Sequence, residues 1–256
     1  MSVKNPLLAA AACALLSSTP GLAATATAPP VKNIVLVHGA WVNGSGWKPV
    51  FEILVKHGYH VSVAEHPLTS FGDDVTAVKR VLAMQEGPTI LVGHSYGGAI
   101  ITEVGNDPKV VGLVYIAAHA LDEGETEVAN GKKFPNATKA VKRTTDDFLY
   151  LDPAFYPADF AADLPEEQAK FEAQAEELTA ASVFGTPAGI PAWKTKPSWY
   201  MVAKADRIIN PDLERMYAKR AHSHTVEIEG ASHSVYESHP KEVAALIEQA
   251  AQHSQD

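Results

Sequence analysis

A serine framed by glycines is the feature of this sequence whose type and spacing most directly suggest chemistry. Residues 93–97 read Gly-His-Ser-Tyr-Gly, which fits the pattern Gly-x-Ser-x-Gly. Chance alone would produce that pattern in roughly one chain in ten of this length, but here an apolar run at 89–92 precedes it and small helix-forming residues follow. A serine in such a strand-turn-helix setting has an exposed Oγ above a helix N-terminus, whose N–H groups favour negative charge. The motif therefore indicates a nucleophile at Ser95, with an ordinary tight turn as the alternative.

A histidine and an aspartate late in the chain are the candidates for activating this serine. His233 follows a predicted strand at 225–228. Asp206 comes a few residues after another predicted strand, at 198–203. Because ligand sites of parallel sheets form at the carboxyl ends of the strands, both residues should reach the edge that carries Ser95. His233 would take the serine proton, and Asp206 would fix the histidine tautomer. Asp122, beyond an earlier strand, is the alternative acid.

The loop after the first predicted strand is suited to stabilise an oxyanion. The sequence His38-Gly39-Ala40-Trp41 follows that strand directly. A tetrahedral intermediate needs two N–H donors, one from the residue after the nucleophile and one from this loop. We expect the amides of Tyr96 and Ala40 to supply them, with Trp41 as the alternative to Ala40. His38 and His94 are interpreted as structural residues.

Strands and helices alternate on both sides of one long interruption. The alternation predicts an α/β fold with a mostly parallel six-stranded sheet, right-handed crossovers and helices on both faces. The predicted strands are 33–37, 61–64, 89–92, 110–117, 198–203 and 225–228, and the predicted helices lie near 49–57, 73–87, 99–104 and after Pro165, Pro211 and Pro240.

The interruption at about 121–196 is too long for a plain connector in a compact domain. We predict a helical cap inserted after the fourth strand of a single domain at 31–256. Aromatic side chains concentrate in this insertion and near the predicted site, and as a group they favour an apolar pocket for a small or medium-sized, apolar or aromatic substrate. The predicted pocket residues are Trp41, Phe148, Tyr150, Phe184, Trp193 and Tyr236.

The N-terminus and the overall charge restrict location and partners. Lys4, an apolar run and small residues predict a signal peptide at 1–23, cleaved after residue 23 or 26, and hence a periplasmic or secreted protein. The apolar run is too short to span a membrane. The only cysteine, Cys13, lies in this segment, so the mature chain has no thiolate for a metal site or a nucleophile. The net charge of −9 disfavours nucleic acid as a partner, and the sequence leaves the oligomeric state open.

The motifs together resemble a known family. Residues 35–41 (Val-Leu-Val-His-Gly-Ala-Trp) and 92–98 (Val-Gly-His-Ser-Tyr-Gly-Gly), with Asp206 and His233, resemble bacterial α/β-hydrolases akin to the plant methylesterase and hydroxynitrile lyase group. The resemblance covers nearly the whole mature chain except the cap. It implies a sheet that begins with the third strand of the eight-stranded pattern, a Ser95-His233-Asp206 triad, and oxyanion donors at Ala40 and Tyr96.

Two departures from the lyases favour an esterase. Hydroxynitrile lyases carry a lysine beside the catalytic histidine and a threonine in the first loop, whereas this chain has Ser234 and Gly39-Ala40 there. Dehalogenases of this fold use an aspartate nucleophile, which Ser95 excludes. We therefore expect a serine esterase that forms an acyl-enzyme without metal or organic cofactor. The alternatives are other chemistry on the same triad (C–C or C–CN lysis, perhydrolysis) and a small-molecule receptor of this fold with little turnover.

Overall fold

The computed structural model describes residues 1–2 and 31–254. Apart from its first two residues, the predicted signal peptide lies outside the described residues, as do both predicted cleavage positions. Within the described part, no helix is long and apolar enough to cross a membrane.

Six parallel strands form the central sheet, in the order β2-β1-β3-β4-β8-β9. The four inner strands are apolar and almost entirely buried, as parallel strands covered on both faces should be. The two edge strands keep several exposed or half-buried positions. The predicted sheet is thus confirmed, with all of its pairings parallel. The strands are β1 (Asn33–Val37), β2 (His60–Ala64), β3 (Thr89–Ser95), β4 (Val110–Ala118), β8 (Ser198–Ala203) and β9 (His224–Ile228).

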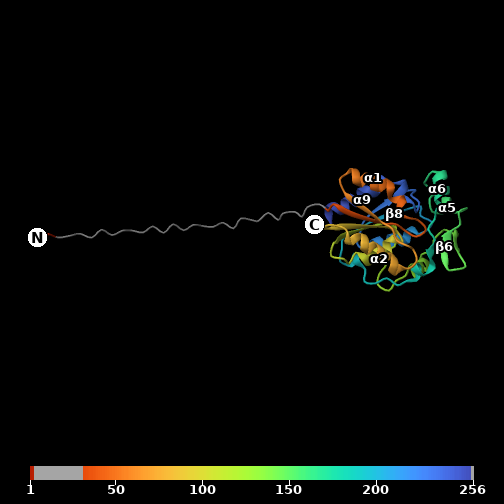
Figure 1. The fold of residues 1–256 in the computed structure, drawn as a ribbon, viewed down its shortest axis with the longest axis horizontal. Coiled ribbons are helices and arrows are strands. Elements are labelled where there is room, and N and C mark those ends of the chain that lie inside the picture. The colour runs from red at the N-terminus through yellow and green to blue at the C-terminus, as the bar shows by residue number, and fades with distance from the viewer. Residues whose placement is uncertain (3–30, 255–256) are drawn as a thin grey trace.

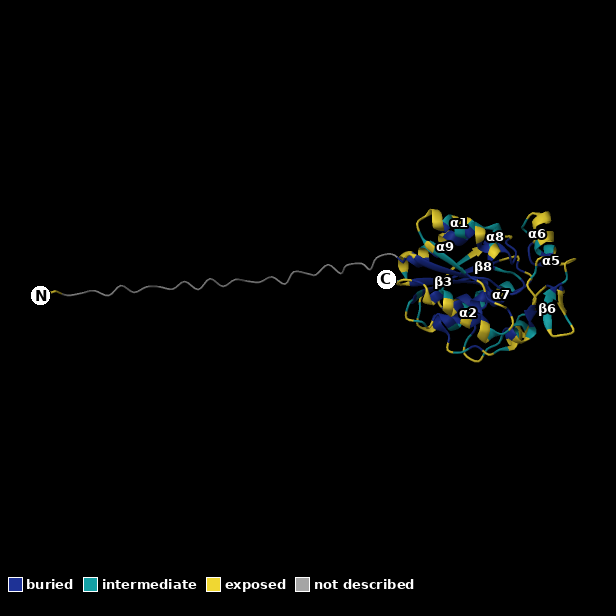
Figure 2. Ribbon diagram, viewed as in Figure 1, coloured by how far each residue is buried: buried dark blue, intermediate teal, exposed yellow. Residues whose placement is uncertain are grey.

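Two helical layers enclose this sheet, and β1 shows how its side chains divide between them. Ile34 and Leu36 pack into the core beneath α1 and α9, whereas Val35 and Val37 pack into the core beneath α2 and α3. This alternation follows from the two-residue period of a strand. Figures 1 and 2 show the buried strands between α1, α8 and α9 on one side and α2 and α7 on the other. The helices are α1 (Lys48–Lys56), α2 (Phe71–Ala83), α3 (Gly97–Val104), α7 (Pro211–Arg220), α8 (Val235–Ser238) and α9 (Pro240–His253).

The insertion between β4 and β8 is only partly helical, which corrects the predicted helical cap. It contains a three-stranded antiparallel sheet, β5-β6-β7, with short helices around it. The aromatic and aliphatic run of β6 favours a strand, and residue 147, in the turn before β6, has a φ of 73°. Figure 1 shows β6, α5 and α6 together at one end of the central sheet. The elements are α4 (Glu127–Lys133), β5 (Val141–Arg143), β6 (Phe148–Leu151), α5 (Tyr156–Asp159), α6 (Glu166–Glu172), β7 (Thr179–Ala180) and the 3₁₀ helices at 181–185 and 192–194.

The cap contacts the core at the loops that carry the predicted site. The amide of Ala180 donates to the carbonyl of Leu68, and the amide of Glu177 donates to the carbonyl of Trp41. The cap strand β7 therefore lies against the loop that follows β2, and the segment before β7 lies against the loop that follows β1.

Candidate active site

Ser95 occupies a strained turn between β3 and α3. Its φ of 53° lies in the left-handed region, which costs energy for a residue with a Cβ. The glycines of the motif make this turn possible. A Cβ at Gly93 would lie 2.6 Å from the carbonyl oxygen of Gly97, and a Cβ at Gly97 would lie 2.5 Å from the carbonyl oxygen of His38. The sequence pattern is therefore a packing requirement of the turn that presents the serine.

His233 and Asp206 meet at the same edge of the sheet. The Nδ1 of His233 lies 2.5 Å from Oδ2 of Asp206, and both side chains are fully buried. The other oxygen of Asp206 accepts from the amides of Ile208 (2.7 Å) and Ile209 (2.9 Å), which fixes the carboxylate. A carboxylate at Nδ1 places the ring proton there, because only that nitrogen then acts as donor. In the described part of the chain, Nε2 of His233 has no hydrogen-bond partner.

A second carboxyl group, missed by the sequence analysis, lies behind this pair. Glu214 is fully buried on α7, and its Oε2 accepts from the amide of Ala203 (3.1 Å). Burial, reinforced by the negative charge of Asp206, raises the pKa of Glu214 well above its ordinary value. Burial therefore favours the neutral form of Glu214 next to the carboxyl group that contacts His233. In the sequence, the burial of Glu214 could have been inferred from its position on the apolar face of α7, between Leu213 and Tyr217, which are both buried.

His94 connects the segment of Ser95 to that of His233. Its Nε2–H donates to the carbonyl of His233 (2.9 Å), and the two rings lie 4.7 Å apart between centroids. Burial lowers the pKa of His94 well below its usual range, and the neighbouring His233 adds to this. His94 is thus a neutral donor that holds the histidine loop beside the serine turn.

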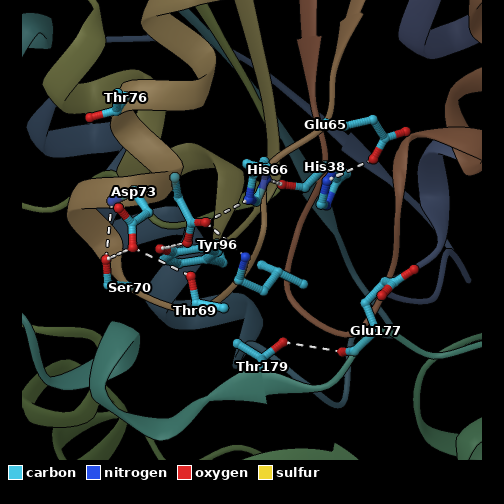
Figure 3. Close-up of polar contacts among 12 residues, drawn as sticks. His38, Glu65, His66, Thr69, Ser70, Asp73, Thr76, Tyr96, Glu177 and Thr179 are labelled. Carbon is cyan, nitrogen blue, oxygen red and sulfur yellow. Dashed lines mark hydrogen bonds and ion pairs between the residues drawn. The ribbon is translucent and has the colours of Figure 1, made fainter.

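The loop after β1 lies directly against the serine. A Cβ on Gly39 would be 2.7 Å from the Cβ of Ser95, so only glycine allows this approach. The amide of Trp41, the alternative oxyanion donor, instead donates to Oγ1 of Thr179 (3.1 Å). Figure 3 shows Thr179 on the cap. The buried Ala40, which precedes Trp41, therefore remains the candidate oxyanion donor from this loop.

Buried polar contacts behind the loop keep it in place. Nε2 of His66 donates to the carbonyl of His38 (3.1 Å), and the two rings stack at 3.8 Å between centroids. Oε2 of Glu65 lies 3.3 Å from Nε2 of His38, and this contact lowers the pKa of Glu65. Figure 3 shows this row of side chains beside Tyr96, whose hydroxyl donates to Asp74 (2.6 Å). The contacts of His38 with His66 and Glu65 thus support its interpretation as a structural residue.

Asp122, the alternative acid, belongs to a different cluster. Its Oδ1 pairs with Nζ of Lys194 at 2.5 Å, and Oδ1 also accepts from the amide of Glu123. The carboxylate that contacts His233 is that of Asp206.

A cavity of about 260 Å³ opens at Ser95. Two of the six predicted pocket residues, Trp41 and Phe184, line it. Leu149 also lines it, and because side chains alternate along a strand, its neighbours Phe148 and Tyr150 face away. The remaining lining residues are His119, Glu127, Val128, Gly131, Phe134, Asn136, Val141, Arg143, Ala181, Ile208, Ile209, Asn210 and Leu213.

The other two predicted pocket residues lie elsewhere. Trp193 is buried where the cap meets the core, and its Nε1–H donates to the carbonyl of Leu121 (2.9 Å). Tyr236 packs on Trp47 and lines a separate cavity of about 270 Å³ between the cap and α8. Phe148, Tyr150, Trp193 and Tyr236 are thus absent from the lining of the cavity at Ser95, because their orientation depends on cap packing, which aromatic content alone does not specify.

The described residues include no cluster of three or more His, Cys, Asp or Glu side chains arranged to hold a metal ion.

Comparison with known proteins identifies the family. Residues 34–246 match the model of the Alpha/beta hydrolase family, which spans most of the chain. The chain belongs to this family. The family resemblance predicted from the motifs is thereby confirmed.

Several relatives in this family are named for hydrolysis. A pyrethroid hydrolase of Sphingobium wenxiniae is 28% identical over 243 residues, covering 85% of this chain and 86% of that protein. A carbendazim hydrolyzing esterase of Nocardioides sp. is 36% identical over 111 residues, or 38% of this chain and 46% of that protein. The crystal structure of a pyrethroid hydrolase from Sphingobium faniae has a TM-score of 0.75 at 25% identity, covering 86% of this chain and 97% of that one. Together with the family match, these relatives show that the chain is an ester hydrolase.

Proposed function

We propose that this chain cleaves carboxylic esters of small to medium-sized, apolar or aromatic substrates through an acyl-enzyme on Ser95. The contact between His233 and Asp206 carries the proposal. A carboxylate at Nδ1 favours the tautomer whose basic nitrogen is Nε2, and this buried histidine lies at the edge of the sheet that carries the strained serine turn. These are the components that serine hydrolysis requires.

In the proposed reaction, Nε2 of His233 removes the proton of the Ser95 hydroxyl as Oγ attacks the ester carbonyl carbon. The amides of Ala40 and Tyr96 donate to the resulting oxyanion, and each such donor is typically worth about 3 kcal/mol. The imidazolium then returns its proton to the departing alcohol. Water, deprotonated by the same nitrogen, attacks the acyl-enzyme, and release of the acid restores Ser95.

The cavity supports the substrate class. Its walls include Trp41, Phe184, Leu149, Ile208 and Leu213, so it is largely apolar next to Ser95. One of the relatives named above is called a pyrethroid hydrolase, and this name supports hydrolysis of an ester by this chain as well. The size of the cavity favours esters with one medium-sized apolar group.

One experiment tests both the nucleophile and the turnover. The mature protein is incubated with p-nitrophenyl acetate, and separately with a fluorophosphonate, whose adduct is then located by mass spectrometry. Release of nitrophenol together with an adduct on Ser95 is the expected result. An adduct with negligible turnover on a panel of esters would indicate a receptor of this fold, and no adduct would refute Ser95 as nucleophile.

We also propose that the protein is exported, on the basis of the predicted signal peptide. Expression of the full chain in a Gram-negative host should give a periplasmic product whose N-terminus is residue 24 or 27. A product that retains residue 1 and stays in the cytoplasm would contradict this proposal.

A further inference from the structure

The loop that carries His233 is held by the core through its carbonyl groups. Residues 229–234 form this loop, which connects β9 to α8. The amide of Ala205 donates to the carbonyl of Ala231 (2.9 Å), and His94 donates to the carbonyl of His233 (2.9 Å). The backbone amides on either side of His233 have their partners in the cap instead.

A short cap segment, residues 159–163, contacts the residues before and after the histidine. The amide of Ser234 donates to the carbonyl of Phe160 (3.0 Å), and the amide of Ser232 donates to Oδ2 of Asp163 (3.1 Å). The hydroxyl of Ser232 donates to the other oxygen of Asp163. The carboxylate of Asp163 therefore holds Ser232 by two hydrogen bonds, one to its backbone and one to its side chain.

The same segment also packs on the imidazole of His233. The ring of Phe160 is fully buried and lies 4.7 Å from the ring of His233 between centroids, at an interplanar angle of 77°. Edge-to-face contacts of this kind are favourable for aromatic rings and depend on their orientation. The cap thus contacts both the backbone around His233 and the ring itself.

The other end of the segment holds the loop of Asp206. Oδ1 of Asp159 accepts from Nε of Arg207 (2.7 Å), the residue that follows Asp206. Oδ2 of Asp159 accepts from the hydroxyl of Thr138 (2.7 Å), whose amide donates to the carbonyl of Arg207 (2.9 Å). Five consecutive cap residues therefore contact both loops whose side chains form the pair of His233 and Asp206.

This segment lies outside the cavity that opens at Ser95. None of residues 159–163 is among the described residues that line that cavity. An effect of the segment on the reaction would therefore pass through His233 and Asp206, not through contact with substrate in that cavity. Such an effect can be large, because misplacing a reacting group by about 1 Å can lower the rate about 100-fold.

We propose that the cap segment 159–163 positions the pair of His233 and Asp206, and that Asp163 is a positioning residue for His233. The cap then has two tasks: it forms part of the substrate cavity, and it keeps the general base in place. This inference rests on the proposed ester hydrolysis and adds a positioning residue to it.

The test compares three variants. Asp163→Ala removes both hydrogen bonds to Ser232. Asp163→Asn can keep both, because its oxygen accepts from the Ser232 amide and its NH₂ group donates to the hydroxyl oxygen, whose proton then turns to the carbonyl of Phe160, 3.1 Å away. Asp152→Ala is the matched control, because Asp152 is a cap aspartate whose side chain contacts Ala154 and Lys142, both within the cap.

Values of kcat and KM are measured with p-nitrophenyl butyrate, after thermal melts have shown that each variant is folded. We expect Asp163→Ala to lower kcat at least about tenfold, because His233 is no longer held in place. Its KM should stay within about threefold of the wild type, because the cavity at Ser95 is unchanged. Asp163→Asn and Asp152→Ala should keep kcat within about threefold of the wild type.

A second comparison tests whether Asp163 acts through the histidine. Asp163→Ala is repeated in an Asp206→Asn background, in which the base is already impaired. There it should lower the residual kcat by less than about threefold, since residues that act as a unit are not additive. If Asp163→Ala does not fold by circular dichroism, Ser232→Ala, which removes the hydroxyl contact alone, is compared in the same two backgrounds. It should lower kcat about threefold in the first and leave it unchanged in the second.

The results that would overturn the positioning role leave the esterase intact. They are a wild-type kcat in Asp163→Ala, an equal decrease in Asp163→Asn and Asp163→Ala, or the same factor of decrease in both backgrounds. A wild-type protein that hydrolyses no ester and forms no adduct on Ser95 would instead overturn the proposed function, and this inference with it.

Discussion

Replacing Asp206 by Asn would reverse the histidine tautomer that the proposed mechanism needs. One oxygen of Asp206 accepts from the amides of Ile208 (2.7 Å) and Ile209 (2.9 Å), while the other faces Nδ1 of His233. In Asp206→Asn, the single amide oxygen must stay with the two backbone N–H groups. The NH₂ group then faces Nδ1, which becomes an acceptor, and the ring proton moves to Nε2. That nitrogen could no longer take the proton of Ser95.

The size of the effect follows from this loss. The equivalent substitution in a serine protease lowers kcat about 10⁴-fold because of the wrong tautomer, which corresponds to about 5.5 kcal/mol of activation free energy. Here the two backbone amides hold the asparagine in the unfavourable orientation and both side chains are fully buried, so we expect a decrease of the same order. The fold should persist, because asparagine has the same shape.

The assay is kcat for p-nitrophenyl butyrate at pH 7.5, with thermal melts to check folding. Asp122→Asn is the matched control, because Asp122 is the other candidate acid and pairs with Lys194 instead of a histidine. Its kcat should stay within about twofold of the wild type. A folded Asp206→Asn protein that loses less than tenfold in kcat, or an Asp122→Asn protein that loses far more, would refute the assignment of the acid.

Three further substitutions probe the surroundings of the site. Tyr96→Phe removes a buried hydrogen bond to Asp74 and should lower Tm by about 3–6 °C in calorimetry, while kcat stays within about threefold because the proposed donor is the backbone amide. Gly39→Ala places a Cβ 2.7 Å from that of Ser95 and should lower kcat/KM at least about tenfold; unchanged kinetics would contradict the described approach of the loop. Burial and a neighbouring carboxylate raise the pKa of Glu237 to about 8, so the folded state binds the extra proton, and stability should fall as the pH rises from about 5 to 9. Thermal melts of Glu237→Gln should show a smaller decline over that range.

The sheet and the serine turn could be predicted because their signals are local in the sequence. Apolar runs identified the inner strands, and the alternation of strands with helices identified the two edge strands. The two glycines around Ser95 identified the turn, since both would clash if they carried a Cβ. The strand-helix alternation also fixed which loops lie at one edge of the sheet. His233 and Asp206 could therefore be chosen among many candidates from the sequence, and in the structure Nδ1 of His233 lies 2.5 Å from Oδ2 of Asp206.

The cap and the polar surroundings of the site depend on tertiary contacts that no local pattern contains. The β5-β6-β7 sheet consists of strands of two to four residues whose pairing joins residues up to 32 positions apart, such as Phe148 with Ala180. Glu127 reads as an ordinary helical glutamate whose burial only packing reveals, whereas the position of Glu214 on the apolar face of α7 is a local signal. His119 follows β4 as an unremarkable loop residue, yet its amide bonds to Ser95.

The three buried histidines around Ser95 differ in one respect that bears on the proposed mechanism. His94 donates to a backbone carbonyl and not to a carboxylate. His119 contacts Glu127, but burial raises the pKa of this carboxyl group and so disfavours its charged form. Burial lowers the pKa of both rings, so neither takes up the serine proton.

Of these three histidines, only His233 has a carboxylate at Nδ1, that of Asp206, and burial raises the pKa of the neighbouring Glu214. Moving a proton from Ser95 to His233 therefore creates an imidazolium next to a fixed negative charge, whereas the same transfer to His94 or His119 would create an uncompensated buried cation. The site thus contains three imidazoles near one hydroxyl, but its electrostatics favour protonation of only one of them. Moving the negative charge from Asp206 to the side of His119, as in the double variant Asp206→Asn with Tyr217→Glu, should consequently not restore activity at Ser95. Substantial recovery of kcat in that variant would mean that a general negative field suffices and that the Nδ1 contact is dispensable.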